Sequence, residues 1–222
     1  MSALPSPTPA RPTAAETLIA VGLAGTSGAA LLVHAFGPVP LSFTAPFVVL
    51  PASLLLVGAI LIRRRQFERI DALRARLVRG AGWGLIATLA YDAVRPLIKV
   101  LVGYAFDPYR AMPIFGSLIT GLPGTDPLAI AAGWLYHFWN GITFGVIFAL
   151  VRPRGGVPAG IAWAMALQVL MMLAYPTLLK ARLDDPGFLM LGLVGHTVWG
   201  IVLGAGLRRM ASRDAARGAA HA

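Results

Sequence analysis

Six long apolar segments limit what this chain can fold into. They cover about residues 17–36, 44–62, 81–103, 128–151, 157–178 and 188–207. Each is close to the roughly 20 residues that a helix needs to cross the bilayer core. Only 13% of the residues are charged, whereas soluble domains have about 25%. The sequence therefore predicts an all-α membrane protein built as a six-transmembrane-helix bundle.

The placement of basic residues predicts the orientation of this bundle. If both termini are cytoplasmic, fourteen arginines fall on the cytoplasmic side, and only Arg110, Lys180 and Arg182 fall on the outer side. Cytoplasmic loops normally carry such an excess. The preference for Arg over Lys and the abundant Ala favour a bacterial source, so we expect the bacterial inner membrane. Because the basic residues flank apolar segments, the net charge of +10 does not indicate a nucleic-acid partner.

The predicted parts of the chain differ in polarity and charge. They are a disordered cytoplasmic tail (1–16), an N-terminal transmembrane hairpin (17–62), a basic amphipathic cytoplasmic connector (63–80), a four-helix membrane domain (81–208) and a second disordered cytoplasmic tail (209–222). The connector, from Arg63 to Arg79, is either a helix on anionic lipid of the inner leaflet or a solvated link. The apolar but Pro- and Gly-rich loop 104–127 either enters the bilayer, covers a cavity, or lies at the interface.

An internal repeat relates the fourth and sixth predicted helices. Residues 126–145 and 185–204 align without gaps at an offset of 59, with seven identities in twenty positions that include the scarce Asp, Pro and His. In each copy Asp-Pro predicts a helix start. The following Gly-x3-His-x3-Gly-x3-Gly puts four residues on one face, where the glycines allow close helix approach. Both helices run in the same direction, so His137 and His196 lie at equal depth, about 16 Å below the start and near the bilayer midplane.

A polar stripe on the third predicted helix supplies further candidate residues. Its members share one face at spacings of four, three and four, and are Thr88, Asp92, Arg95 and Lys99. Charges at membrane depth are costly and normally face a partner or water, so Asp92 and Arg95 are expected to neutralise each other. The predicted ligand or proton site consists of Asp92, Arg95, His137, Asn140 and His196, with Lys99, Gln168 and Tyr175 as secondary members.

Three functions fit this set. The leading hypothesis is binding or transport of a small solute, an ion or a proton, with Asp92 as proton or cation site, Arg95 as its counter-ion or as an anion contact, and the two histidines as a titratable pair. The second is a non-catalytic structural or assembly subunit, alone as a homo-oligomer or with a partner membrane subunit. The third is a membrane enzyme acting on a lipid or isoprenoid substrate. Since no soluble-enzyme motif occurs, we assign no catalytic residue.

We predict no cofactor and no metal site. The sequence has no cysteine, which excludes thiolate ligands. The alternative is a haem or a metal ion held by His137 and His196, and closely packed glycine faces would leave no gap for a haem. A cavity that reaches both histidines would favour a binding site, whereas a solid core with glycine faces in contact would favour the structural subunit.

Two motifs carry a resemblance to a known family. They are Gly133-Trp-Leu-Tyr-His137-Phe-Trp-Asn140-Gly141-x-x-Phe144-Gly145 and His196-x-x-x-Gly200-x-x-x-Gly204. Over about residues 81–208 the chain resembles an uncharacterised family of small bacterial four-helix membrane proteins, whose Trp/Met-rich helix is matched by Trp163, Met171 and Met172. The first two helices would be an addition. The resemblance implies the architecture of the membrane domain and nothing about its mechanism.

Overall fold

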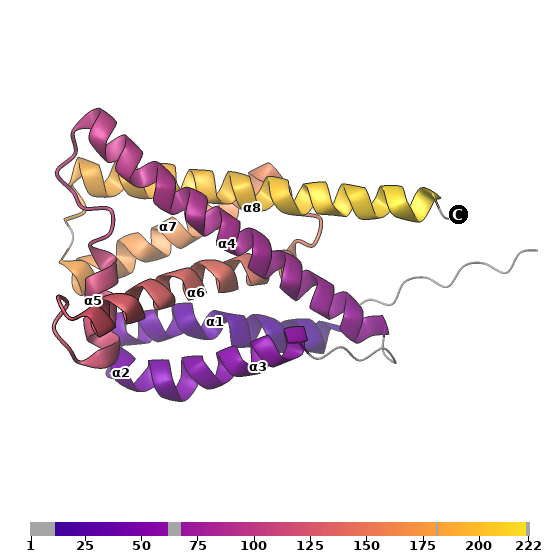
Figure 1. Cartoon of the computed structure of the whole chain (residues 1–222), viewed down its shortest axis with the longest axis horizontal. Helices are drawn as coiled ribbons and strands as arrows, with labels where there is room; N and C mark the ends of the chain where they lie inside the picture. The colour runs from indigo at the N-terminus through magenta and orange to yellow at the C-terminus, as the bar shows by residue number, and fades with distance from the viewer. Residues whose placement is uncertain (1–11, 62–67, 181, 221–222) are drawn as a thin grey trace, which may run out of the picture.

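The computed structural model describes residues 12–61, 68–180 and 182–220, which contain helices and no strand (Figure 1). The helical elements in chain order are α1 (Ala14–Phe36), α2 (Leu41–Thr44), η1 (Ala45–Val49), α3 (Leu50–Leu61), α4 (Glu68–Val102), α5 (Ala111–Thr120), α6 (Pro127–Val151), α7 (Val157–Leu179) and α8 (Pro186–Ala220). Because α2, a π-helical turn η1 and α3 follow without a break, the described residues hold seven helices.

Five of these helices are long and apolar enough to cross a membrane. They are α1, the continuous segment Leu41–Leu61, α6, α7 and residues Pro186–Arg217 of α8. Large apolar side chains are exposed on their outer faces, for example Leu18, Phe47 and Leu135, which are all more than 60% exposed. Such a surface fits lipid and would be unfavourable in water. The prediction of an all-α fold with membrane-spanning helices is therefore confirmed to this extent: the described residues are helical, and five helices are long and apolar enough to cross a membrane.

The helix α4 is not among these five, although six spans are predicted. Its first half is rich in arginine, and its second half contains Asp92, Arg95 and Lys99, which lower its mean hydropathy. Figure 1 shows α4 crossing the bundle diagonally, and it packs against both α6 and α8. This position between the two histidine-bearing helices makes α4 the central element of the polar interior.

Close contacts at glycines hold these helices together. A Cβ atom on Gly84 of α4 would lie 2.8 Å from the carbonyl oxygen of Gly141 in α6. A Cβ atom on Gly200 of α8 would lie 2.6 Å from the carbonyl oxygen of Gly160 in α7. Side chains have no room at these points, so the glycines let the backbones touch, as expected from the spacing on α6 and α8.

The predicted connector 63–80 is not a separate element, which corrects the sequence-based division. Residues 62–67 lie outside the described residues, and residues 68–80 form the first turns of α4. Leu77 is 1% exposed and packs with Leu56 of α3 and Val146 of α6. Protein therefore covers the apolar face of residues 68–80 at Leu77, and this packing stabilises them as the first turns of α4.

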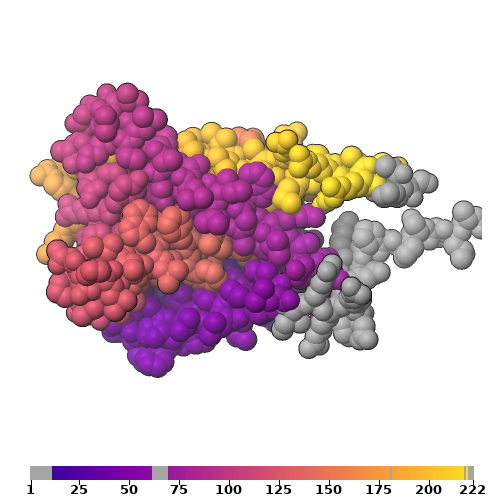
Figure 2. Space-filling model, in the orientation of Figure 1, coloured from indigo at the N-terminus to yellow at the C-terminus, as the bar shows by residue number. Residues whose placement is uncertain are grey.

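The predicted disordered tail 209–222 also needs correction, because α8 continues to Ala220. The C-terminal part of α8 extends beyond the rest of the bundle (Figure 2). An ion pair of 2.6 Å between Arg79 of α4 and Asp214 of α8 joins the two helices there. At the other terminus, α1 begins at Ala14 rather than 17, because Thr13 and Glu16 form a capping box. Residues 1–11 of the predicted tail lie outside the described residues.

The loop 104–127 contains the short helix α5, whose ten residues are too few to span a bilayer. The helix packs on the start of α6, where Gly133 and the backbone of Met112 are in direct contact range. Phe115 of α5 is 3% exposed and faces the interior between α1 and α6. The loop thus forms a cover over one end of the bundle, which fits the covering role among the alternatives.

Candidate functional site

Asp92, Arg95 and His137 form one hydrogen-bonded cluster. The Asp92 Oδ1 atom accepts from Arg95 Nη2 at 2.6 Å, and Oδ2 lies 2.8 Å from His137 Nε2. Asp92 and Arg95 are only 8% and 7% exposed. Arg95 is permanently charged and Asp92 is its counter-ion, so a neutral His137 that donates from Nε2 leaves the cluster without net charge. The close contact of α4 with α6 brings the three side chains together.

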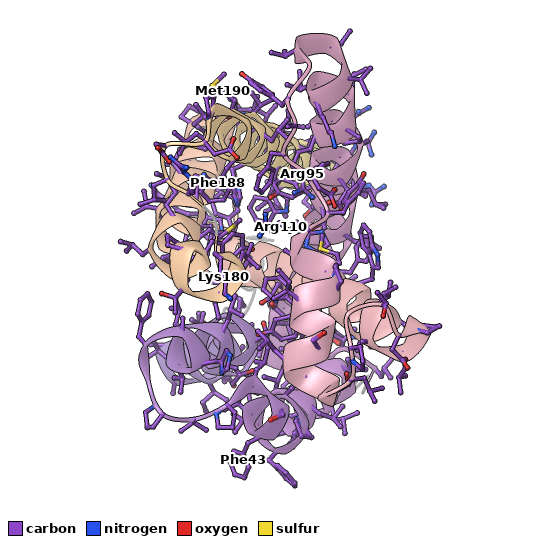
Figure 3. All side chains as sticks on the ribbon, turned by 90° about the vertical axis from the view of Figure 1, so that its left-hand side faces the viewer. Phe43, Arg95, Arg110, Lys180, Phe188 and Met190 are labelled. Atoms are coloured by element: carbon purple, nitrogen blue, oxygen red, sulfur yellow. The ribbon has the colours of Figure 1, made fainter. Side chains whose placement is uncertain are left out.

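The Arg95 side chain also ties the cluster to the loop between α4 and α5. Its Nη1 atom donates to the carbonyl oxygen of Pro108 at 2.6 Å, and its guanidinium lies 4.0 Å from the ring centre of Tyr91. The Tyr109 hydroxyl donates to the backbone oxygen of Asp92 at 2.8 Å. Burial raises the pKa of Tyr109, and the Asp92 carboxylate acts in the same direction. Figure 3 views Arg95 from this end of the bundle.

His196 has different surroundings. Its Nδ1 atom lies 2.9 Å from the carbonyl oxygen of Gly192, one turn earlier in α8. Its ring meets the edge of Tyr91 with centroids 5.0 Å apart, and Tyr91 lies 6.1 Å from the ring of His137. Tyr91 therefore contacts both histidines.

A cavity of about 350 Å³ lies beside this cluster, and both histidines line it. Asn140 and Tyr91 contribute further polar groups, and most of the remaining wall is apolar. The wall comes from α1, α4, α5, α6, α7 and α8. Ala29 of α1 and Leu170 of α7 belong to the wall and are also exposed on the outside of the bundle. The cavity consequently reaches the apolar flank of the protein between α1 and α7.

A second, smaller cavity of about 40 Å³ lies towards the α4–α5 loop. Arg95, His137 and Gln168 line it, and Tyr175 lines both cavities. Asp92 and Lys99 line neither. Of the predicted residues, the structure thus brings six around the two cavities and joins Asp92 to them through His137 and Arg95. Lys99, at the far end of α4, is not brought to the site.

Three buried polar atoms have no hydrogen-bond partner among the described residues: Arg95 Nε, Asn140 Oδ1 and Gln168 Oε1. Such atoms are costly unless a ligand or water meets them. Asn140 lines the larger cavity and Gln168 lines the smaller one. Each cavity therefore has in its wall a residue with a hydrogen-bond acceptor that lacks a partner among the described residues.

Tyr91 and Tyr109 also belong to the site, although neither is predicted from the sequence. Tyr91 stands four residues before Arg95, and a guanidinium and an aromatic ring at this helical spacing often contact each other. That signal was available in the sequence. No comparable signal exists for Tyr109, because its contact depends on how the loop folds back.

A haem between the two histidines does not fit this arrangement. Tyr91 contacts both rings, and the His137 Nε2 atom is engaged by Asp92. Among the described residues, no group of three or more His, Asp or Glu side chains could hold a metal ion.

Comparison with known families bears on the same helices. Residues 74–217 match the model of a family of unknown function, DUF6789. The chain belongs to this family. The predicted resemblance to an uncharacterised family is therefore confirmed, and the DUF6789 match covers α6, α7 and most of α4 and α8, including the whole Asp92 cluster. The helices α1, α2 and α3 lie outside the matched residues. Neither the curated proteins nor the solved structures contain a match to the chain.

Proposed function

We propose that this protein binds a small solute inside the membrane, in the cavity that His137 and His196 share. The observation that carries this proposal is the cavity itself, which reaches both histidines and is about 350 Å³ in volume. Pockets of this size with apolar walls and a few polar groups are typical ligand sites. A binding protein and a transporter for this solute would both use this cavity, so the proposal covers both.

The packing of the glycine faces supports the second hypothesis only in part. Gly145 and Gly204 contact the backbones of α4 and α7, which is how a structural bundle is held together. A purely structural core would be solid, yet here a cavity remains between the packed helices. A homo-oligomer or a partner subunit would add to this function rather than replace it.

The geometry favours a solute over a cation or a proton. Both carboxylate oxygens of Asp92 are already engaged, one by Arg95 and one by His137. Asp92 also does not line the cavity. An enzyme acting on a lipid would use His137 or His196 as general acid or base, since these reach the cavity and the flank towards lipid.

The proposed topology has six spans, with α4 as the sixth and both termini in the cytoplasm of a bacterial inner membrane. Burial of Asp92 and Arg95 against α6 and α8 supports α4 as a span, because paired and covered charges are tolerated at membrane depth. A basic cleft at one end is lined by Arg76, Arg79, Arg152 and Arg154. The start of α4 and the end of α8 lie at this end, and Arg110 and Lys180 at the opposite end (Figures 1 and 3). Anionic lipid is the partner that we propose for this basic end.

The repeat between α6 and α8 is part of the same proposal. Asp126 caps α6 by accepting from the Leu128 amide at 2.8 Å, and Asp185 caps α8 by accepting from the Gly187 amide at 2.8 Å. The shared caps and glycine contacts support a duplicated helix that presents one histidine per copy to the cavity.

Photolabelling tests the proposed function. Purified protein in lipid nanodiscs is irradiated with an alkane that bears a diazirine, and labelled residues are mapped by mass spectrometry. We expect label on Trp199, which lines the cavity and is only 4% exposed. Ala29→Phe narrows the cavity at the flank and should lower this label several-fold.

Val33→Phe is the matched control, because Val33 is exposed on α1 one turn away and does not line the cavity. It should leave the label on Trp199 unchanged. Label confined to outward-facing side chains such as Leu173 would contradict the proposal and favour the structural subunit.

A further inference from the structure

The hydrogen-bonding groups of the larger cavity are unevenly divided between donors and acceptors. The indole of Trp199 donates to Thr88 Oγ1 at 3.2 Å, and the Thr88 hydroxyl donates to the Gly84 carbonyl at 2.8 Å. The indole of Trp163 donates to the Phe144 carbonyl at 3.3 Å. The donor atoms of these three wall residues thus already have acceptors within the protein.

The Asn140 amide is oriented by its own helix. Its Nδ2 atom donates to the carbonyl oxygen of Tyr136 at 3.0 Å. Because a carbonyl only accepts, this contact fixes which end of the amide is nitrogen. The Oδ1 atom is left buried and without a partner among the described residues.

The two histidines are oriented by the same logic. The Gly192 carbonyl can only accept, so His196 carries its proton on Nδ1. No carboxylate contacts His196 among the described residues, and an isolated charge in an apolar interior is disfavoured. In the neutral ring Nε2 is therefore a free acceptor. The Asp92 carboxylate can only accept, so His137 donates to it from Nε2.

Two residues of the cavity wall, Asn140 and His196, thus carry acceptors that have no partner among the described residues. Tyr91 and Tyr175 also line the cavity, but a hydroxyl both donates and accepts and does not select between ligands. A ligand that supplies a donor satisfies the free acceptors, whereas a carboxylate or phosphate would meet acceptors with further acceptors.

The charge of the ligand follows from the Asp92 cluster. The carboxylate nearest to the cavity is shared by Arg95 and His137 and does not line the wall. An ammonium group would have no free counter-ion in this apolar space, and such a charge is costly at membrane depth. A hydroxyl is a donor without that cost.

We propose that the cavity binds a neutral molecule with an apolar chain and a hydroxyl group, which enters from the lipid between α1 and α7. This inference rests on the proposed function. The hydroxyl donates to Asn140 Oδ1 or to His196 Nε2, and the chain lies along the apolar wall towards Ala29 and Leu170, where the cavity reaches the flank.

Competition against the photolabel on Trp199 tests this ligand class in nanodiscs. The competitors share an eight-carbon chain and are 1-octanol, octyl methyl ether, octylamine and octanoate, each compared at its measured concentration in the lipid. We expect 1-octanol to compete at about a fivefold lower concentration than the ether, as one net hydrogen bond provides. Octylamine and octanoate should compete less well than 1-octanol.

Variants locate the acceptor. Asn140→Leu removes the free oxygen, and His196→Phe keeps a ring while it removes Nε2. We expect each to reduce the preference for 1-octanol over the ether, and the double variant to abolish it. Gln168→Leu is the matched control, because Gln168 also has a buried oxygen without a partner among the described residues but lines only the smaller cavity. It should keep the fivefold preference.

The outcomes separate this inference from the proposed function. If Trp199 takes no label, the proposed function fails and the inference fails with it. If Trp199 is labelled and the ether competes as well as 1-octanol, the cavity binds a solute but the donor class is wrong. Stronger competition by octanoate or octylamine would likewise overturn the hydroxyl assignment. The comparison in the unchanged protein needs no variant, so a variant that misfolds does not block the test.

Discussion

The helices α6 and α8 carry the same glycine spacing and the same Asp-Pro start, yet their histidines have different partners. His137 contacts Asp92 and is linked through it to Arg95 and the α4–α5 loop. His196 bonds to the Gly192 carbonyl of its own helix. One motif therefore places one histidine in a charge network and the other beside an aromatic ring.

The difference arises from two adjacent residues of α4. Successive residues of an α-helix point about 100° apart, so a helix that crosses between two others presents different side chains to each. Asp92 contacts His137 on α6, whereas Tyr91 packs its ring 5.0 Å from His196 on α8. A repeated helix can thus acquire two chemistries from a third helix that is not repeated.

The largest expected effect comes from Asp92→Asn, which removes the charge on the His137 side of the comparison. Arg95 would remain buried without its counter-ion, and loss of one partner of a buried ion pair costs about 3–5 kcal/mol. We expect a fall of this order in the free energy of unfolding, measured by circular dichroism in mixed micelles titrated with dodecyl sulfate.

The double variant Asp92→Asn/Arg95→Met is the control for this prediction. It removes both charges and should recover most of the lost stability. If the Asp92→Asn protein is as stable as the unchanged protein, the charge network around His137 does not distinguish it from His196 in the way that the structure indicates.

Replacing each histidine in turn measures how much its hydrogen bond contributes to the free energy of unfolding. His137→Leu removes a donor from a buried carboxylate, which costs about 1.5–3 kcal/mol, whereas His196→Leu removes a bond to a neutral carbonyl, which costs about 0.5–1.5 kcal/mol. The same unfolding titration should rank them in this order. Leu135→Ala, at a side chain 73% exposed on α6, provides a reference for an outward-facing position. Equal losses for the two histidines would remove the distinction between the helices.

The features that depend on local pattern were the ones that sequence could predict. The Asp-Pro starts of α6 and α8, the apolar helices of membrane-spanning length and the pairing of Asp92 with Arg95 follow from spacing and polarity, and the structure contains each of them. The contact between Asp92 and His137 was expected only as proximity at one depth, because crossing angles are not encoded in a single helix.

The features that depend on packing between distant segments could not be predicted. Residues 68–80 look like a surface helix until Leu77 is seen packed on α3 and α6. The tail after 208 looks polar and unstructured until Asp214 is seen paired with Arg79. The cavity likewise depends on how the helices pack. The space at the flank between α1 and α7 cannot be predicted from the sequence of either helix alone.

The smallest expected effect concerns the loops that precede α6 and α8. The loop before α8 contains an exposed ion pair between Arg182 and Asp184. The hydrogen bond from Arg182 holds the pKa of Asp184 below its ordinary value. A lowered carboxylate pKa stabilises the folded state above the unfolded pKa of about 3.9, and this contribution is lost as the pH falls through the lower folded value. Since both side chains are more than two-thirds exposed, solvent and salt screen the pair and its effect on stability is slight.

Arg182→Gln should therefore raise the pKa of Asp184 in a carboxyl carbon NMR titration and leave the signal of Asp126, at the start of α6, unchanged. If Asp184 titrates identically in the variant and the unchanged protein, the ion pair with Arg182 has no effect on its pKa, and the loops before α6 and α8 do not differ electrostatically as expected.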